Sequence, residues 1–245
     1  MNTQKIMNKG VKMIAHRGLS GLEKENTCSA FVAAGNRESY YGIETDIHVT
    51  ADGEFVVFHD DDTARVGLDR LELEKTTAQT LKSLQLCDID GKRGRRDLLI
   101  PMLKDYILIC KKYEKECILE YKNAFSEEDI ARSLQVIKEL CYLEHVTFIS
   151  FCFDNLVILR KMCPKNTIQY LLDSWNDAVL AELQRYSMDL DMCHTAITEE
   201  IVNAVHSIGQ KVNCWTVNDA TDGEKLIALG VDYITSDILE GKNER

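Results

Sequence analysis

The stretch Ile43-Glu44-Thr45-Asp46-Ile47-His48-Val49 decides the fold, because it is short, rich in β-branched residues and alternates charged with apolar side chains. Successive side chains of a strand point to opposite faces, so the carboxylates Glu44 and Asp46 lie on one face. The residues between them take the other face and suit packing on helices. The segment 117–122 repeats the pattern, since Glu120 and Lys122 share a face. Both segments therefore predict strands with one polar side and one helix-covered side.

Outward from this stretch, short β-branched runs alternate with longer segments of helical period. Helices are predicted to start at Asn26 or Thr27 and at Ser126 and Thr198, and to span 102–113, 154–162, 176–186 and 219–229. Eight βα units in 245 residues favour an α/β fold of the closed (β/α)8 TIM-barrel type over an open doubly wound sheet. No linker or repeat interrupts the chain, so a single domain over 1–245 is expected. The eight predicted strands are 11–15, 43–49, 117–121, 146–149, 167–171, 188–192, 211–216 and 233–235.

One stretch, 48–100, breaks the alternation after the second strand. Asp52-Gly53 is a hairpin turn signal, and 55–58 is the predicted returning strand. An insertion of this length is usually functional or a partly ordered subdomain, and here it leaves the barrel at the carboxyl ends of the strands. We expect it to govern which substrates enter, while the barrel governs the chemistry. The basic run 92–96 within it is expected to be a solvated loop.

Charge and composition exclude several classes of partner. The chain has 29 Lys and Arg against 40 Asp and Glu, for a net charge of −11, which argues against broad nucleic-acid binding and adhesion to anionic membranes. No apolar run is long enough for stable membrane insertion, and residues 1–13 lack the apolar core of a signal peptide. The nine cysteines form no CxxC pair, and those in apolar stretches, such as Cys110, Cys117, Cys141 and Cys214, are predicted to be buried. A reducing, cytoplasmic location is expected.

Charged and titratable residues converge near the predicted strand ends. A single one of them is more often structural than catalytic, for example in a salt bridge between Glu44 and Arg17 or between Asp46 and Lys122. Burying them all together is costly without a ligand or an ion. The set comprises His16, Arg17, Glu44, Asp46, His59, Glu120 and Lys122.

The three carboxylates of this set, Glu44, Asp46 and Glu120, offer only oxygen ligands, which suit a hard divalent cation, Mg²⁺ or Ca²⁺. A divalent ion would leave one negative charge on the group. Arg17 and Lys122 more than offset that charge, so the site can accept a phosphodiester anion.

In this order, the motifs resemble the glycerophosphodiester phosphodiesterase family over essentially the whole chain. Further matches lie at 50–53, 100–103, 150–151 and 230–235. The pieces that carry the resemblance are Ile14-Ala15-His16-Arg17-Gly18, Glu25-Asn26-Thr27, Ile43-Glu44-Thr45-Asp46, Phe58-His59-Asp60, Leu119-Glu120-Tyr121-Lys122 and Cys214-Trp215-Thr216-Val217-Asn218.

The resemblance implies a TIM-barrel, metal-dependent hydrolase that converts a small-molecule glycerophosphodiester into glycerol 3-phosphate and an alcohol. It implies that His16 and His59 are the general acid and base. Arg17 and Lys122 would bind the phosphoryl oxygens, and Trp215 would pack against the glycerol. The metal would lie on Glu44, Asp46 and Glu120.

The chain departs from the family pattern at three positions, and the sequence is compatible with two alternative functions. Lys24 stands where the family usually has Pro, Tyr121 where Leu is common, and Ser236 where Asp would follow Thr235. Glu25 is either a metal or glycerol ligand or a favourable charge before a helix. A phospholipase D-like hydrolase of lysophospholipids would need an apolar groove or exposed aromatic cluster at the mouth. A non-catalytic phosphodiester-binding barrel would be expected to lack a histidine or a metal carboxylate.

Overall fold

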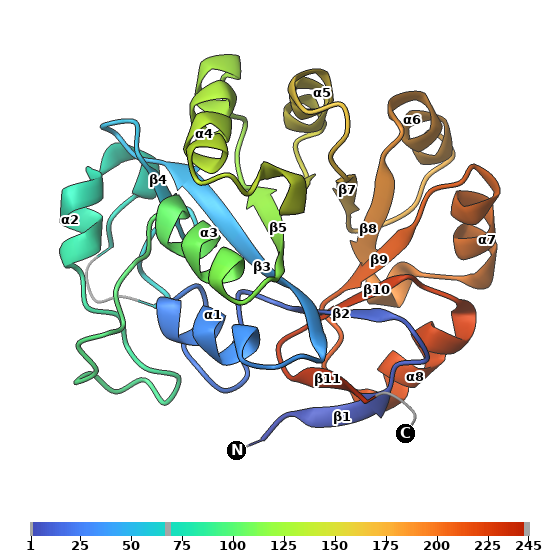
Figure 1. The fold of residues 1–245 in the computed structure, drawn as a ribbon, viewed down its shortest axis with the longest axis horizontal. Coiled ribbons are helices and arrows are strands. Elements are labelled where there is room, and N and C mark those ends of the chain that lie inside the picture. Colours follow the sequence, from blue (N-terminus) through green and yellow to red (C-terminus); the bar gives the residue numbers. More distant parts are fainter. Residues whose placement is uncertain (1, 67–69, 243–245) are drawn as a thin grey trace.

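The computed structural model describes residues 2–66 and 70–242, and in it eight parallel strands close into a barrel (Figure 1). The strand β2 pairs with both β10 and β3, and this double pairing completes the ring. The predicted TIM barrel is therefore confirmed. In their order around the ring the strands are β2 (Lys12–Ala15), β3 (Tyr40–Val49), β5 (Glu116–Tyr121), β6 (Val146–Ser150), β7 (Ile168–Leu172), β8 (Asp189–Cys193), β9 (Val212–Trp215) and β10 (Tyr233–Ser236).

Helices follow the strands and cover the outside of the barrel. Thr27, Ser126 and Thr198 cap their helices with side-chain oxygens that accept backbone N–H groups, as the sequence predicts. The 3₁₀ turns η2 (Leu143–His145) and η3 (His194–Ala196) lie in connections. The outer helices are α1 (Cys28–Gly35), α3 (Leu103–Lys112), α4 (Glu127–Glu139), α5 (Phe153–Met162), α6 (Val179–Tyr186), α7 (Glu199–Ser207) and α8 (Ala220–Leu229).

Side-chain alternation separates two cores. The apolar face of β3 belongs to the large core between strands and helices, where Tyr106 of α3 donates its hydroxyl to the Ile43 carbonyl at 2.7 Å. Inside the barrel, a small apolar cluster fills the centre. This inner cluster borders the polar residues at the strand ends, because Ile149 lies opposite Glu120 in the pairing of β5 with β6. Its buried members are Ile14, Ile118, Ile149, Leu171 and Tyr233.

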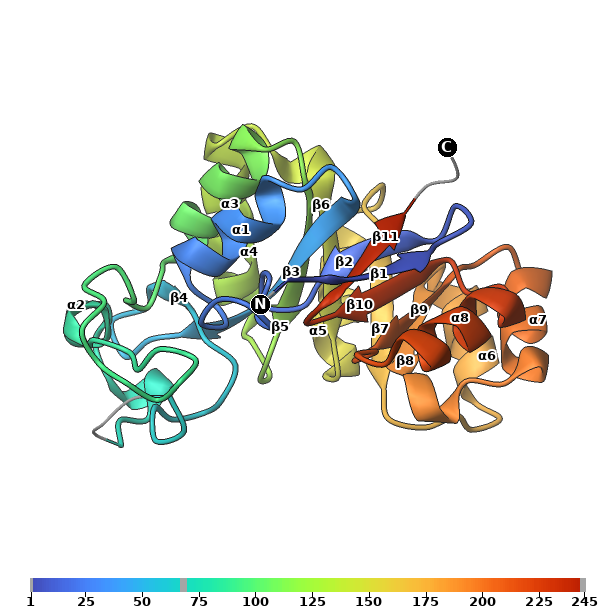
Figure 2. The same ribbon diagram turned by 90° about the horizontal axis from the view of Figure 1, so that it is seen from below.

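The insertion has more order than its charged sequence suggests. The predicted hairpin is present, because β4 (Phe55–Val57) pairs antiparallel with β3. The 3₁₀ turn η1 (Leu73–Lys75) and the helix α2 (Ala78–Ser83) follow, and neither was predicted. Figure 2 shows the insertion projecting to one side of the barrel. Positions 67–69 lie outside the described residues. The insertion encloses its own apolar cluster of Val56, Phe58, Val66, Leu73, Ala78, Leu81, Leu86, Leu98 and Ile100.

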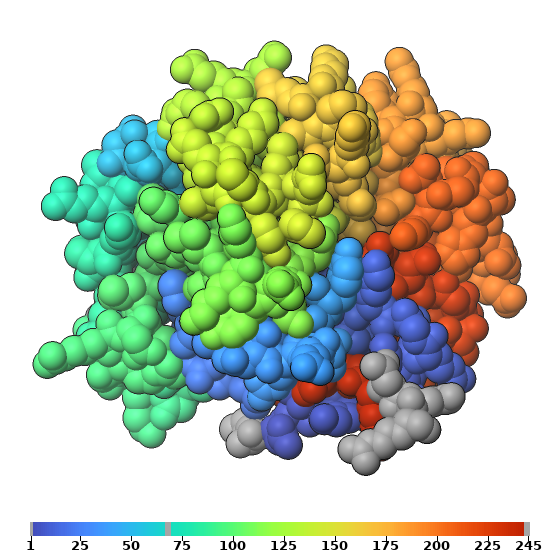
Figure 3. Space-filling view, in the orientation of Figure 1, coloured from blue at the N-terminus to red at the C-terminus, as the bar shows by residue number. Residues whose placement is uncertain are grey.

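Two short strands outside the barrel were not predicted from the sequence. The strands β1 (Gln4–Met7) and β11 (Leu239–Lys242) pair in parallel, with Gln4 opposite Leu239. They place a segment near the N-terminus beside one near the C-terminus (Figure 1), at the lower edge of the molecule as it is oriented in Figure 3. Each strand has only four residues, and its partner lies at the opposite end of the sequence, so no local periodicity signals the pair.

The cysteine prediction is wrong at one position. All nine cysteines are free, and Cys110, Cys117 and Cys214 are buried as predicted. Cys141 is exposed, because it follows the end of α4 in a left-handed turn (φ 51°) on the surface. Within 2–66 and 70–242, no helix has the length and apolar character that a membrane crossing requires.

Two of the departures from the family pattern have a structural explanation. The Tyr121 ring is buried between Phe125 and Phe148, and its hydroxyl lies 2.7 Å from Ser133 Oγ on α4. Tyr121 therefore ties β5 to a helix where Leu would only fill space. Ser236 Oγ accepts the backbone N–H of Leu239 at 2.8 Å, which fixes the turn into β11.

We predict that Tyr121→Phe lowers the free energy of unfolding by about 1 kcal/mol, because it removes one buried hydrogen bond while Ser133 keeps its bond to the Ile130 carbonyl. Urea titration followed by circular dichroism measures the change. Tyr113→Phe is the matched control, since the Tyr113 hydroxyl makes no hydrogen bond to any described residue. Equal stability of the two variants would contradict the assigned role of the Tyr121 hydroxyl.

Candidate active site

The predicted site residues meet at the carboxyl ends of the barrel strands. One cavity there is lined by seven of the eight, and the eighth, Asp46, lies buried beside Glu44 and Glu120. The cavity wall also contains residues that the sequence analysis did not propose. These additional residues are Ile149, Phe151, Leu171, Asp191, Thr216 and Thr235.

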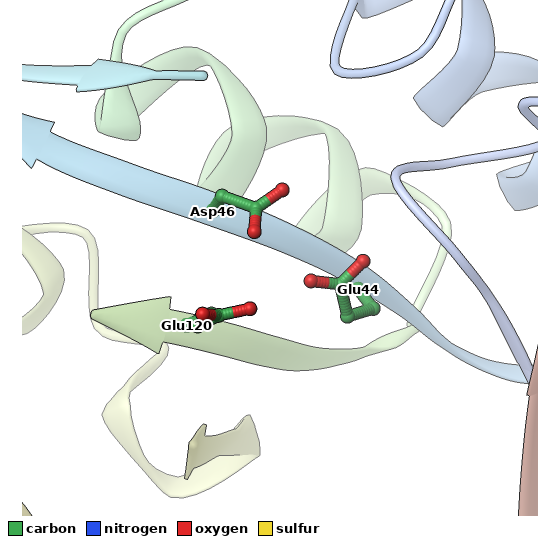
Figure 4. Close-up of side chains that lie close together, drawn as sticks. All are labelled: Glu44, Asp46 and Glu120. Carbon is green, nitrogen blue, oxygen red and sulfur yellow. The ribbon is translucent and has the colours of Figure 1, made fainter. Parts of the chain in front are cut away.

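Three carboxylates form the centre of the site (Figure 4). Glu44 and Asp46 project from β3 and Glu120 from β5, and the register places Asp46 directly opposite Glu120. One oxygen from each lies within 4.8 Å of the others, and all three side chains are buried. Asp46 Oδ1 has no hydrogen-bond partner among the described residues. This set of oxygens matches the preferences of a hard divalent cation.

The charges of these carboxylates are only partly compensated. Burial raises the pKa of Glu44 well above its ordinary value, and the neighbouring Asp46 and Glu120 raise it further. Burial and Asp46 raise the pKa of Glu120 to about 8, against the opposing effect of Lys122. Burial would also raise the pKa of Asp46, but Lys122 and Arg17 outweigh it and hold that pKa low. Without a further cation, all three groups do not ionise together near neutral pH.

Arg17 and Lys122 supply the positive charge that is present. Lys122 Nζ lies 2.8 Å from Glu120 Oε1 and 3.5 Å from Asp46 Oδ1. Arg17 Nε lies 3.8 Å from Asp46 Oδ2, and the Arg17 backbone N–H donates to Glu44 Oε2 at 2.8 Å. The predicted pairing of Asp46 with Lys122 is confirmed. Glu44 contacts Arg17 through the backbone rather than the guanidinium.

The two histidines are each held by a carboxylate. His16 Nδ1 lies 2.6 Å from Asp237 Oδ1, and His59 Nδ1 lies 2.6 Å from Asp60 Oδ1. Engaging Nδ1 leaves Nε2 as the ring nitrogen available to a ligand. Burial lowers the pKa of His59, while Asp46 opposes that effect. The sequence analysis assigned no role to Asp60 or Asp237. Asp60 directly follows His59, whereas Asp237 reaches His16 only through the closure of the barrel.

An ion-pair network joins the insertion to the loop after β2. Arg65 donates to Glu25 through both terminal nitrogens at 2.7 Å, and its Nε donates to Asp60 at 2.6 Å. Glu25 also accepts from Arg17 at 2.9 Å. These arginines outweigh the effect of burial and lower the pKa of Glu25 to about 2. Glu25 is therefore an arginine partner rather than a simple helix-terminal charge, and Arg65, which the sequence analysis missed, connects Arg17 to His59.

The basic run 92–96 provides a second ion-pair contact between the insertion and the loop after β2. Arg95 Nη1 pairs with Glu23 Oε2 at 2.6 Å, and the guanidinium also pairs with Asp97 at 2.6 Å. Lys92 pairs with Asp90 at the exposed surface at 2.8 Å. The expectation of a solvated loop thus holds for Lys92 but is incomplete for Arg95.

The wall opposite the carboxylates is mostly apolar and aromatic. The Phe151 and Trp215 rings pack edge to face with centroids 5.6 Å apart, and Phe151 is exposed. Asp191 on β8 is a buried exception, and burial, reinforced by Glu120, raises its pKa well above its ordinary value. Asp191 could have been identified from the sequence, because Asp189 and Asp191 alternate in a predicted strand in the same pattern that identified Glu44 and Asp46.

Comparisons with known proteins identify the family of the chain. The profile of the glycerophosphoryl diester phosphodiesterase family matches residues 16–240. A glycerophosphodiester phosphodiesterase of Caldanaerobacter subterraneus is 30% identical, with 92% of this chain and 93% of the relative covered. A phosphodiesterase of Oleispira antarctica, solved in complex with the product sn-glycerol-3-phosphate, is 28% identical, with a TM-score of 0.83 and 96% of both chains covered. A glycerophosphodiester phosphodiesterase of Parabacteroides distasonis is 28% identical, with a TM-score of 0.75 and with 97% of this chain and 94% of that one covered. The chain therefore belongs to the glycerophosphoryl diester phosphodiesterase family of hydrolases.

Proposed function

We propose that the protein hydrolyses small-molecule glycerophosphodiesters to glycerol 3-phosphate and an alcohol, in the cytoplasm. The observation that carries the proposal is that two imidazoles, each held by a carboxylate, line the same cavity as a buried carboxylate triplet. The product complex of the Oleispira antarctica phosphodiesterase supports the substrate class. The nine free cysteines are consistent with a reducing compartment.

His16 and His59 are the proposed general acid and base. One imidazole takes the proton from the attacking hydroxyl and the other gives a proton to the leaving alcohol. In the proposed sequence, the glycerol hydroxyl next to the phosphoester attacks phosphorus first, and water then opens the resulting cyclic phosphate. Intramolecular attack benefits from the high effective concentration of that hydroxyl. Asp237 and Asp60 fix the ring orientations and stabilise each imidazolium when it forms.

Glu44, Asp46 and Glu120 are the proposed ligands of Mg²⁺ or Ca²⁺. The fit rests on their clustered oxygens and on Asp46 Oδ1, which accepts no hydrogen bond from the described residues. A bound divalent cation supplies positive charge that stabilises the phosphoryl oxygens. With the carboxylate charge compensated, Lys122 and Arg17 become available for the oxygens of a phosphodiester. Trp215 is proposed to pack its ring against the glycerol carbons.

One observation favours a second candidate, a lysophospholipid hydrolase acting through the same site. The exposed Phe151, packed edge to face with Trp215, gives the mouth the aromatic surface that such a substrate needs. The patch comprises one aromatic pair, so we rank deacylated glycerophosphodiesters first. The remaining alternative, a non-catalytic barrel, is disfavoured because every proposed catalytic and metal-binding group is present.

We predict that turnover requires a divalent cation. Glycerophosphodiesters with different headgroups are assayed with Mg²⁺, Ca²⁺ or excess chelator, coupled to detection of glycerol phosphate. Chelator should abolish turnover, and Asp46→Asn should weaken cation binding measured by calorimetry. Because the pKa of Glu120 is about 8 in the ion-free site, cation affinity should rise as the pH increases toward 8. Full turnover in chelator with no bound metal would contradict the proposal.

We predict that His16 and His59 act as a unit. Either alanine substitution should lower kcat by about 10²- to 10⁴-fold, the usual range for a general acid or base. The double variant should lose far less than the product of the two effects, because one broken step already stops the reaction. His206→Ala is a control, since His206 pairs with Asp232 away from the cavity. A kcat near wild type in either single variant would show that the histidine concerned has no such role.

We predict that Arg65→Ala lowers kcat by about 10- to 100-fold, a typical cost of losing a group that orients a site residue. Without Arg65, the Asp60 charge acts more strongly on His59, so the pKa of His59 should rise. The acid limb of the pH–rate profile should then move to higher pH. Arg65→Lys should restore part of the rate. Arg70→Ala is the matched control, because Arg70 is an exposed arginine of the insertion that pairs only with Asp62. Identical profiles for Arg65→Ala and wild type would argue against this positioning role.

A further inference from the structure

We propose that Asp191 and the indole N–H of Trp215 together recognise the free terminal hydroxyl of the substrate's glycerol, and so exclude substrates that carry an acyl chain there. This inference rests on the proposed function and narrows its substrate class to deacylated glycerophosphodiesters. It is carried by two unsatisfied polar atoms in the wall of one cavity.

Asp191 is a carboxylate that the proposed chemistry does not use. It points into the barrel from β8, is 2% exposed, and lines the same cavity as His16 and Glu120. It does not belong to the cluster of Glu44, Asp46 and Glu120. Its Oδ1 is buried and makes no hydrogen bond to the described residues. An orphaned buried acceptor is costly, so it requires an explanation such as a missing ligand group.

Trp215 provides the complementary group, a hydrogen-bond donor without an acceptor. Its Nε1 is buried and has no acceptor within the described part of the chain. In the pairing of β8 with β9, Asp191 lies opposite Asn213 and Cys193 opposite Trp215. Asp191 and Trp215 are therefore diagonal neighbours on adjacent strands, and both face the cavity.

An acceptor and a donor on one wall are complementary to a hydroxyl, which both donates and accepts. A phosphate oxygen would satisfy only the indole, and an ammonium only the carboxylate. The side chains beside Asp191 on the adjacent strands are uncharged, with Leu171 opposite it on β7 and Asn213 opposite it on β9. A carbon chain that ends in a hydroxyl therefore fits this part of the cavity better than a charged group does.

Glycerol in a phosphodiester has two hydroxyls, and their positions decide which one contacts Asp191 and Trp215. The one next to the phosphoester must lie at the histidines, where it attacks phosphorus. The terminal one is a carbon further from phosphorus and is free to reach the β8–β9 wall. The glycerol is assigned to the part of the cavity beside the buried Asp191, and the variable alcohol to the part beside the exposed Phe151. An ester at the terminal oxygen removes the donor and leaves Asp191 unpaired.

The test compares two substrates with the same headgroup: glycerophosphoethanolamine, and its analogue built on propane-1,2-diol, which keeps the attacking hydroxyl and lacks the terminal one. Wild type should prefer the first by about 10- to 100-fold in kcat/KM, the usual cost of leaving a buried polar group without its hydrogen bond. Asp191→Ala should collapse this ratio to within about threefold, by lowering kcat/KM for glycerophosphoethanolamine alone. Asp191→Asn, which keeps an acceptor, should retain part of the preference, and Trp215→Phe, which keeps the ring, should also reduce it.

Asp189→Asn is the matched control, since Asp189 lies on the same face of β8 but does not line the cavity. Its preference should equal that of wild type. In parallel, calorimetry with sn-glycerol 3-phosphate and with 2-hydroxypropyl phosphate should show the same loss of discrimination in binding. A 1-acyl lysophospholipid should be a poor substrate for wild type.

Three results would overturn the inference. The first is a preference as large as that of wild type in Asp191→Asn and Trp215→Phe as well as in Asp191→Ala. The first two variants are conservative enough to report this if the alanine variant does not fold. The second is a change confined to the ranking of headgroup alcohols, which would assign Asp191 to the leaving group. The third is efficient wild-type turnover of the acylated substrate. Failure of wild type on every glycerophosphodiester would instead refute the proposed function itself.

Discussion

The enclosure of three carboxylates against one another is the constraint on which the rest of the site depends. Strand alternation puts Glu44 and Asp46 on the inner face of β3, and the register with β5 sets Asp46 opposite Glu120. In a barrel the inner faces converge, so these groups cannot separate. Their repulsion accounts for Lys122 and Arg17 beside them, and for Asn26, which donates to Asp46 Oδ2 at 2.8 Å. Even so, Asp46 Oδ1 accepts no hydrogen bond from the described residues and has only a 3.5 Å ion pair with Lys122. A site that remains short of positive charge is one prepared for a cation.

Strand periodicity made the barrel and its carboxylate cluster predictable from the sequence. Eight strands, their helices and the inner placement of Glu44, Asp46 and Glu120 all depend on a two-residue alternation that is local. Local patterns could not place partners whose proximity arises only when the barrel closes. Asp237 reaches His16 because β10 pairs with β2, and β1 finds β11 from the other end of the chain. Asp191 carried a readable signal, yet its parity alone did not show that it shares a cavity with Glu120.

The insertion shows why loops resist prediction. Its apolar residues follow no regular period and alternate with charged ones, so the sequence did not predict that they form a separate cluster. That cluster includes Val56 and Leu98. Such a cluster gives the segment enough order to hold side chains in fixed places. The expected division between a selecting loop and a catalytic barrel is therefore too simple. The insertion carries His59 and Asp60, and its Arg65 binds Glu25 on the loop that also holds Arg17.

The two walls of the cavity then have different physical characters, and this difference explains how one barrel can combine fixed chemistry with adjustable recognition. On the β3–β5 side, charges constrain one another so tightly that changing one group alters the ionisation of its neighbours. On the β8–β9 side, Trp215 and Asn213 are uncharged, and Asp191 is, among the described residues, the one carboxylate that lines the cavity there, although Glu120 still raises its pKa. Hydrogen bonds on such a wall can be gained or lost with less effect on the cation site than a change within the carboxylate cluster. Discrimination among substrates is therefore most readily built on the side of the barrel farthest from the coupled carboxylates.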